Sequence, residues 1–302
     1  MIHGILNVRK EKGFTSHDVV AKLRGMTRQK KIGHTGTLDP DAEGVLPVCL
    51  GKATKLCDMM TEKEKAYEAV MVLGKETDTQ DLSGRILHTA STEKLSEEQV
   101  KEVVLSFVGA YDQIPPMYSA IKVGGKKLYE LAREGKEIER KPRRVEIHSI
   151  RILDMDLPEV RFEVTCSKGT YVRTLCHDIG KKLGCGACMG ELLRTRSGVF
   201  ALEESRTLSE IDLYLKEGRI EEILIPVDQM FPDSQKVSVK KGQDKTVYNG
   251  NALSPEQIVE KTVMKDGERI RVYGSDGRFL ALYCFNKREK KYQVEKMFYS
   301  PE

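Results

Sequence analysis

The hydrophobic pattern at the start of the chain predicts a strand, a helix and a long polar loop. Ile2–Val8 is a short apolar run typical of a strand. Ser16 stands where a helix cap is expected, and apolar residues then repeat at helical spacing: Val19, Val20, Leu23 and Met26. Lys30–Gly44 follows neither period and is too long for a simple turn, so we expect an extended loop there.

The middle of the chain alternates between strand-like and helix-like segments. We expect four strands, the last two forming an antiparallel pair: Val45–Leu50, Lys65–Leu73, Val145–Leu153 and Val160–Cys166. We expect three helices: Ser96–Val108, Lys127–Glu134 and Thr170–Leu183. Thr77–Gly84 reads as a polar loop, and Ile114–Pro116 with Gly124-Gly125 predicts an ordered connection ahead of the second helix.

The composition changes near Pro226–Lys236, where short alternating segments begin. Asn249-Gly250 and Asp276-Gly277 stand at turn positions, and an Asx-Gly pair between β-rich runs is a strong hairpin signal. We therefore predict two domains, 1–234 and 235–302. The second is small and mostly β, and a domain of about 65–70 residues needs a larger neighbour to pack against.

Length and composition narrow the class of protein. The 302 residues are 39% apolar and 32% charged, as in a folded globular protein of about two domains. No apolar run is long enough for a membrane span, and the charged N-terminal segment is unlike a secretory signal. Seven scattered cysteines indicate reduced thiols, so we expect a cytoplasmic protein.

Positive charge is concentrated in two segments. Residues 1–31 carry eight Lys and Arg against two acids, and residues 122–144 carry nine against four, whereas the whole chain has a net charge of only +4. This distribution is typical of a protein that binds a polyanion such as nucleic acid, although two solvated faces would also produce it.

The remaining motifs give little support for a metal or nucleotide cofactor. Cys185 and Cys188 form a CxxC pair, but Cys176 and His177 are adjacent rather than spaced like a second pair of zinc ligands. We interpret both cysteines as small buried residues. The chain has neither a P-loop nor a dinucleotide-binding fingerprint after a strand, so we expect neither cofactor nor metal.

Two segments carry candidate chemistry. In the loop GHTGTLDPDAEG, Pro40 restricts the backbone of Asp39 and so directs its carboxylate; the alternative is an Asx turn in which Asp39 only bonds neighbouring amides. In KGTYVRTLCHD, Tyr171 and Arg173 stand at a strand-to-helix junction. An arginine there could orient a carboxylate, or it could be a surface residue of a capped helix.

Taken together, these segments resemble the TruB family of tRNA pseudouridine synthases, which isomerise the T-loop uridine at position 55 of tRNA. The resemblance covers nearly the whole chain in the expected order. It rests on GHTGTLDPDAEGVLPVCLGKATK, KAYEA, TDTQDLSG and KGTYVRTLCHDIGKKLGCGACMGELLRTRSG. It implies an α+β catalytic domain with a mixed, largely antiparallel sheet and flanking helices, and a small β-barrel PUA-like domain at the C-terminus.

The resemblance also implies roles for individual residues. Asp39 would be the catalytic aspartate, with Tyr67 and Arg173 beside it in the active site. The residues expected to bind substrate are His34, Tyr67, Tyr171, Leu192 and Lys10. Lys10 begins the segment KEKG, where the family usually has KPxG. Residues from about 110 to 144 correspond to a basic insertion that grips the T-arm.

The expected reaction needs a uridine flipped out of the RNA stack, which costs a few kcal/mol. Asp39 could attack C6 of the uracil, attack C1′ of the ribose, or remove the 2′ proton. Two other functions are also considered: a guide-RNA-dependent synthase that works within a multiprotein particle, and a non-catalytic RNA-binding protein. We expect a stand-alone, monomeric enzyme that acts on tRNA without an obligatory protein partner.

Overall fold

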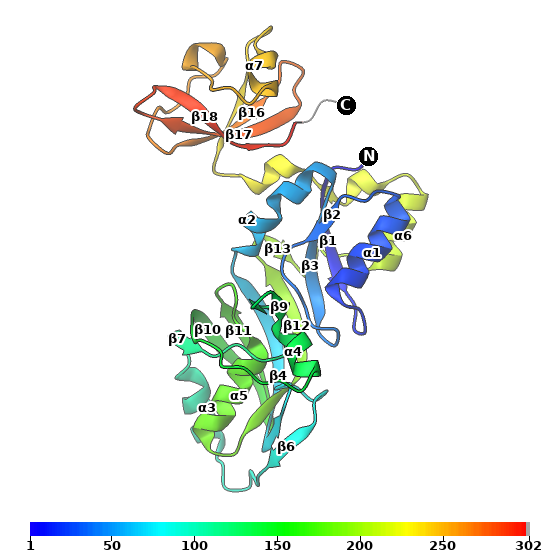
Figure 1. Ribbon diagram of the computed structural model, residues 1–302, viewed down its shortest axis with the longest axis vertical. Helices are drawn as coiled ribbons and strands as arrows, with labels where there is room; N and C mark the ends of the chain where they lie inside the picture. Colours follow the sequence, from blue (N-terminus) through cyan, green and yellow to red (C-terminus); the bar gives the residue numbers. More distant parts are fainter. Residues whose placement is uncertain (300–302) are drawn as a thin grey trace.

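The computed structural model describes residues 1–299 and contains two main sheets (Figure 1). The larger has ten strands, most of them in the blue-to-green part of the chain, with helices beside it. The smaller has four strands and lies at one end of the molecule, in the orange and red part of the chain. The fold is therefore α+β, as the sequence predicts.

The larger sheet is mixed and mostly antiparallel. Its main path runs in the order β14 (Leu224–Ile225), β1 (Gly4–Lys10), β3 (Glu43–Leu50), β12 (Ala187–Ser197), β4 (Lys65–Leu73), β11 (Glu159–Cys166), β10 (Arg143–Asp156) and β7 (Gly109–Gln113). Two short strands extend it, β2 (Ile32–His34) on β3 and β13 (Phe200–Ala201) on β12. In the described part of this sheet only β3 and β12 pair in parallel. Because β12 also pairs with β4, it joins the N-terminal strands to the rest of the sheet.

Two helix pairs bury the apolar faces of this sheet. Near the N-terminus, α1 (Ser16–Thr27) and α6 (Leu208–Lys216) share a core with β1 and β3. Farther along the sheet, α3 (Glu97–Leu105) and α5 (Val172–Leu183) pack on β4, β10 and β11. The second core includes Phe162, which is fully buried beneath these helices.

Short elements complete this part of the chain. They are η1 (Gly51–Leu56), α2 (Cys57–Thr61), β5 (Lys75–Thr77), β6 (Ile86–Thr89), β8 (Lys122–Val123), β9 (Lys126–Lys127), α4 (Leu128–Arg133), η2 (Ile220–Glu222) and η3 (Val227–Met230). The β8–β9 hairpin and α4 occupy the predicted basic insertion, and the turn between the strands contains Gly124 and Gly125.

Most predicted elements occur within a few residues of their expected bounds, but the first helix cap is wrong. Thr15, rather than Ser16, caps α1, because the Thr15 hydroxyl accepts from the Asp18 amide and the Asp18 carboxylate accepts from the Thr15 amide. This is a reciprocal capping box. Ser16 is left free to contact another segment. The predicted loop Lys30–Gly44 also contains the short strand β2.

The smaller sheet begins at Gln235 and has the order β15 (Gln235–Ser238), β16 (Arg269–Tyr273), β17 (Phe279–Asn286) and β18 (Lys291–Met297). Within residues 1–299 its edge strands β15 and β18 do not pair with each other, so this sheet is not closed and the predicted β-barrel is not confirmed. Its connections include α7 (Asp244–Tyr248) and η4 (Pro255–Gln257). The predicted region continues to residue 302, and its last three positions lie outside the described residues.

The two predicted Asx-Gly hairpins have different outcomes. Asp276-Gly277 connects the antiparallel strands β16 and β17, which confirms that hairpin. The Asn249-Gly250 prediction is wrong, because this pair ends α7 instead. Gly250 has a positive φ of 68° and its amide donates to the Val247 carbonyl, as expected where glycine terminates a helix.

A shared apolar core joins the two sheets. Ile5 of β1 and Val45 of β3 belong to the same cluster as Leu282 of β17 and Phe298, which follows β18. Lys55 adds a polar contact, with its Nζ donating to the Met297 carbonyl at 2.7 Å. The smaller sheet therefore packs directly on the end of the larger one.

None of the helices within residues 1–299 is both long and apolar enough to cross a membrane. All seven cysteines are free thiols, and Cys185 and Cys188 are buried, in agreement with their interpretation as small core residues.

Candidate active site

The backbone on both sides of Asp39 is held by the N-terminal segment. Asp39 lies in the loop between β2 and β3. On one side, the Ser16 hydroxyl accepts from the Leu38 amide at 2.9 Å and lies 3.2 Å from the Leu38 carbonyl. On the other, the Pro40 carbonyl accepts from Lys10 Nζ at 3.0 Å and from the Gly13 amide at 2.9 Å. These contacts fix the position of the Asp39 backbone.

Arg173, in the first turn of α5, makes a two-point contact with Asp39. Its Nε lies 2.9 Å from Asp39 Oδ2, and its Nη2 lies 3.3 Å from Oδ1. The Arg173 side chain is only 5% exposed, whereas that of Asp39 is 39% exposed. The arginine thus holds the carboxylate from inside the protein, and part of the carboxylate remains accessible.

The same guanidinium connects three other segments. Arg173 Nη1 donates to the Thr79 carbonyl and Nη2 to the Tyr118 carbonyl, both at 2.9 Å. Nη1 also lies 3.4 Å from Asp81 Oδ2. Because α5, the loop after β5 and the segment after β7 all meet at this group, a change at Arg173 would disturb each wall of the site.

Burial raises the pKa of Asp39 above its ordinary value. The guanidinium of Arg173 opposes this shift, while the Asp81 carboxylate adds to it. Asp39 therefore shares one buried cation with a second carboxylate, Asp81, and its protonation depends on both.

Tyr67 and Arg194 are opposite each other on the paired strands β4 and β12. Tyr67 is buried, which raises the pKa of its hydroxyl, and a hydrogen bond from Arg194 counteracts this. Arg194 is 1% exposed, and its Nε donates to the Val45 carbonyl at 2.6 Å and its Nη2 to the Gly36 carbonyl at 3.2 Å. It therefore ties both ends of the Asp39 loop to β12.

The other predicted substrate-binding residues surround this centre. Tyr171 directly precedes α5, and the Gln113 side chain accepts from its amide at 2.8 Å and donates to its carbonyl at 3.1 Å. Leu192 of β12 is partly buried against the core that contains Tyr67. His34 ends β2, and within residues 1–299 its buried Nδ1 has no hydrogen-bond partner. Burial lowers the pKa of His34, and nearby Arg194 lowers it further.

Lys10 has a different environment from the other predicted binding residues. Its side chain is fully buried, and besides Pro40 its Nζ donates to the Glu11 carbonyl at 3.0 Å. Burial lowers its pKa to about 8, although the surrounding carboxylates oppose this. In this structure its ammonium group contacts the Asp39 loop rather than solvent.

The structure thus brings Asp39 and Arg173 into direct contact, and the charge of Asp39 influences both Tyr67 and Tyr171. Sequence reasoning did not single out Asp81 or Arg194. Asp81 could have been noticed as the last acid of TDTQDLSG, and Arg194 as a charged residue two positions after Leu192.

The described residues contain no group of three or more His, Cys, Asp or Glu side chains arranged to hold a metal ion. The site offers instead a carboxylate on a buried arginine, two buried or half-buried tyrosines and an apolar leucine. Such a set can position a ring and move a proton or form a bond through a carboxylate oxygen.

Family models match most of the chain. The TruB family pseudouridylate synthase N-terminal domain matches residues 24–172, and the tRNA pseudouridylate synthase B C-terminal domain matches residues 173–232. The chain is 53% identical over 307 residues to tRNA pseudouridine synthase B of Lachnoclostridium phytofermentans, covering 98% of this chain and 100% of that protein. It is 47% identical over 272 residues to the enzyme of the same name from Alkaliphilus oremlandii, covering 90% of each.

Solved structures agree with this relationship. One is an H/ACA RNP bound to a substrate RNA containing 2′-deoxyuridine, with a TM-score of 0.72 and 27% identity over 99% of this chain and 86% of that chain. Another is a Cbf5-Nop10-Gar1 complex, with a TM-score of 0.72 and 29% identity over 98% of this chain and 85% of that chain. The chain therefore belongs to the TruB family of pseudouridylate synthases and is an isomerase that acts on uridines of tRNA.

Proposed function

We propose that this enzyme converts the uridine at position 55 of the tRNA T-loop to pseudouridine, with Asp39 as the nucleophile or base. The contact between Asp39 and Arg173 is the observation that supports this proposal most directly. Arg173 holds the Asp39 carboxylate in place, and the exposed part of that carboxylate can still be reached by a ligand. No redox step or added group is needed, since the product is an isomer of the substrate.

The target uridine enters the site after flipping out of the T-loop stack, because its reactive atoms are otherwise shielded. Tyr67 and Tyr171 provide aromatic surfaces for the extruded base, and stacking on one aromatic ring is worth roughly 1–3 kcal/mol. Leu192 contributes the apolar side of the pocket. His34 contacts the nucleotides displaced with the uridine, and Lys10 acts on the same loop through Pro40.

The carboxylate has three possible routes: attack on C6 of the uracil, attack on C1′ of the ribose, or removal of the 2′ proton. Each route requires Asp39 in its ionised form, and the positive charge of Arg173 stabilises that form. The raised pKa of Asp39 also makes it a stronger base than an exposed aspartate.

Two further regions serve RNA binding in this proposal. The insertion at about 110–144 presents exposed lysines and arginines from the β8–β9 hairpin and α4 to the phosphates of the T-arm. Residues 235–302 form a PUA-like RNA-binding domain distinct from the catalytic domain at 1–234. The enzyme works as a monomer.

The test uses tRNA and an isolated T-arm stem-loop, each tritiated at C5 of uridine. Formation of pseudouridine places the glycosidic bond at C5, so tritium must be released to water. Wild-type enzyme should release one tritium per RNA molecule. An RNA with cytidine in place of uridine at position 55 should release none. Asp39→Asn should bind either RNA within a few-fold of wild type and release no tritium.

Asp41→Asn is the matched control, because it removes the same charge from an exposed residue of the same loop. It should release tritium at the wild-type rate. Activity that survives in Asp39→Asn, or release from another position, would refute the assignment.

The structural neighbours suggest a second candidate function, because the two described above are a ribonucleoprotein and a protein complex. If wild-type enzyme binds tRNA but releases no tritium alone, guide RNA and accessory proteins should be added. Activity only in their presence would replace stand-alone action by a guide-dependent one.

A further inference from the structure

Four lysines gather where the two sheets meet. Lys52 and Lys55 lie in η1, at the end of β3, and Lys296 lies in β18 of the smaller sheet. Lys31 is beside them, because its carbonyl accepts from the Gly51 amide at 2.8 Å. Burial lowers the pKa of Lys55, and the charges of Lys31, Lys296 and Lys52 lower it further, so these three ammonium groups lie near that of Lys55.

No ion pair within residues 1–299 neutralises this cluster, although many other charged residues of the surface are paired. Like charges held together without acidic partners cost stability, so their positions favour a role in binding an anion. Among the ammonium groups of these four lysines, only that of Lys55 has a hydrogen-bond partner within residues 1–299, the Met297 carbonyl.

A pair of stacked tyrosines adjoins the lysines. Tyr248, at the end of α7, lies with its ring 4.0 Å from the ring of Tyr299 and nearly parallel to it, at 14°. Lys52 Nζ is 5.8 Å from the Tyr299 ring centre. Both tyrosines are partly exposed. A flat aromatic stack beside ammonium groups suits a nucleotide, because a base can extend the stack while its phosphate meets a lysine.

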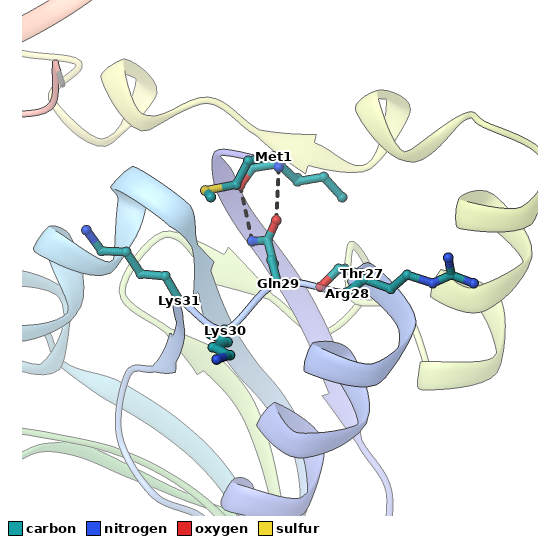
Figure 2. A pocket seen from close by; sticks show the side chains of 7 residues that line it. Met1, Thr27, Arg28, Gln29, Lys30 and Lys31 are labelled. Carbon is teal, nitrogen blue, oxygen red and sulfur yellow. Dashed lines mark hydrogen bonds between the residues drawn. The ribbon is translucent and has the colours of Figure 1, made fainter. Parts of the chain in front are cut away.

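A cavity of about 530 Å³ continues this region on the larger sheet, lined by Met1, Ile2, Thr27, Arg28, Gln29, Lys30 and Lys31. Figure 2 shows the Lys31 side chain extending toward the light-blue turns of η1 and that of Arg28 pointing away on the other side. The Gln29 side chain bonds both backbone groups of Ile2, which fixes the cavity wall. The positive region therefore extends past the lysine cluster.

We propose that a junction surface, formed by Lys31, Lys52, Lys55, Tyr248, Lys296 and Tyr299, binds a segment of the substrate tRNA outside the arm that carries the target uridine. This rests on the proposed function of the Asp39 site. An acidic protein would satisfy the lysines but would leave the stacked rings unused, whereas RNA uses both.

The distance between the two sites supports a separate RNA segment. β3 begins four residues after Asp39 and ends at Leu50, directly before η1. Eight residues of strand span roughly 25 Å. The junction surface and the catalytic carboxylate therefore lie at opposite ends of β3, and a short stem-loop bound at Asp39 would leave the junction surface free.

The experiment compares full-length unmodified tRNA with the isolated T-arm stem-loop. The double variant Lys31→Glu/Lys52→Glu reverses two charges of the junction surface, and Lys94→Glu/Lys101→Glu makes the same change at exposed positions on and before α3. Tyr248→Leu removes the stack without changing charge. Dissociation constants are measured by filter binding over a range of KCl concentrations, and tritium release is measured under single-turnover conditions.

Lys31→Glu/Lys52→Glu should weaken binding of full-length tRNA tenfold or more and reduce the slope of log Kd against log[KCl] by about two. Tyr248→Leu should weaken the same complex several-fold and leave the slope unchanged. Neither variant should alter stem-loop binding or tritium release from the stem-loop, and the α3 control should match wild type with both RNAs.

Two results would overturn the proposal: unchanged tRNA affinity in the charge-reversal and tyrosine variants, or an equal loss with tRNA and stem-loop. Failure of the proposed function is a separate observation, because wild-type enzyme would then release no tritium from either RNA.

Discussion

Arg194 and Tyr67 are register partners across β12 and β4, and the Arg194 guanidinium reaches beyond Tyr67 to the carbonyls of Gly36 and Val45. These carbonyls flank the segment that carries Asp39. One buried cation thus links a tyrosine of the proposed pocket to both ends of the loop that bears the carboxylate.

Arg194→Met should slow single-turnover tritium release about 100-fold, because a loop displacement of about 1 Å is enough for such a loss. The dissociation constant for tRNA should stay within a few-fold of wild type, since Arg194 is buried. Arg196→Met is the control: it lies on the same strand, and its pair with Glu64 is on the surface. Equal effects of the two substitutions on the rate would contradict a positioning role for Arg194.

Asp81→Asn should shift the acid limb of the rate profile to lower pH. The negative charge of Asp81 raises the pKa of Asp39, so its removal lowers that pKa and keeps Asp39 ionised in more acidic solution. Single-turnover tritium release between pH 4 and 8 measures the shift. Asp78→Asn, in the same loop, should leave the limb in place, and a shift of the Asp81 variant to higher pH would disprove the coupling.

Lys10 should make the fold more stable as the pH rises from about 8 to 10.5. Its pKa is about 8 in the folded protein, against the ordinary lysine value of 10.5 in the unfolded chain, so the unfolded chain binds more protons in this window. Urea unfolding of wild type and Lys10→Met at pH 7.5, 9 and 10 isolates this contribution. As the pH rises, the unfolding free energy of wild type should increase relative to that of Lys10→Met. Lys12→Met, at an exposed position, should run parallel to wild type.

Gly44→Ala should destabilise the protein by several kcal/mol. Gly44 has φ of 109°, and an added Cβ would lie 2.2 Å from the Arg194 carbonyl oxygen on the neighbouring strand. Gly13→Ala provides the comparison, because φ there is 87° but no atom lies within 4 Å of the added Cβ. Its cost should be about 1 kcal/mol. Similar unfolding free energies for the two variants would show that the close strand contact has no effect.

The local elements could be predicted because their signals are local. The apolar spacing after residue 16 gave α1, and Asp276-Gly277 gave a hairpin because β-rich runs lie on both sides of it. The predicted cap differs from the observed one by one residue because Thr15 and Ser16 both have hydroxyls, and only the contact with Asp18 distinguishes them. The Asn249-Gly250 pair does not form the predicted hairpin, because glycine suits a helix end as well as a hairpin.

The site required long-range information that spacing does not contain. Asp39 and Arg173 are separated by 134 positions in the chain, and only the family resemblance associated them before the structure. The position of β12 between β3 and β4 brings Arg194 under the Asp39 loop, and no periodicity in the sequence predicts that neighbour relationship. Lys10 illustrates the same limit, because its sequence position did not reveal complete burial.

The apolar core shared by Ile5, Val45, Leu282 and Phe298 also sets a length. Because this core packs the smaller sheet against the larger one, it sets the distance between the junction surface and Asp39. An RNA in which the two contacted segments are closer together or farther apart cannot occupy both places at once. Substrate choice would then depend on the three-dimensional spacing within a folded tRNA as well as on the nucleotides around the uridine.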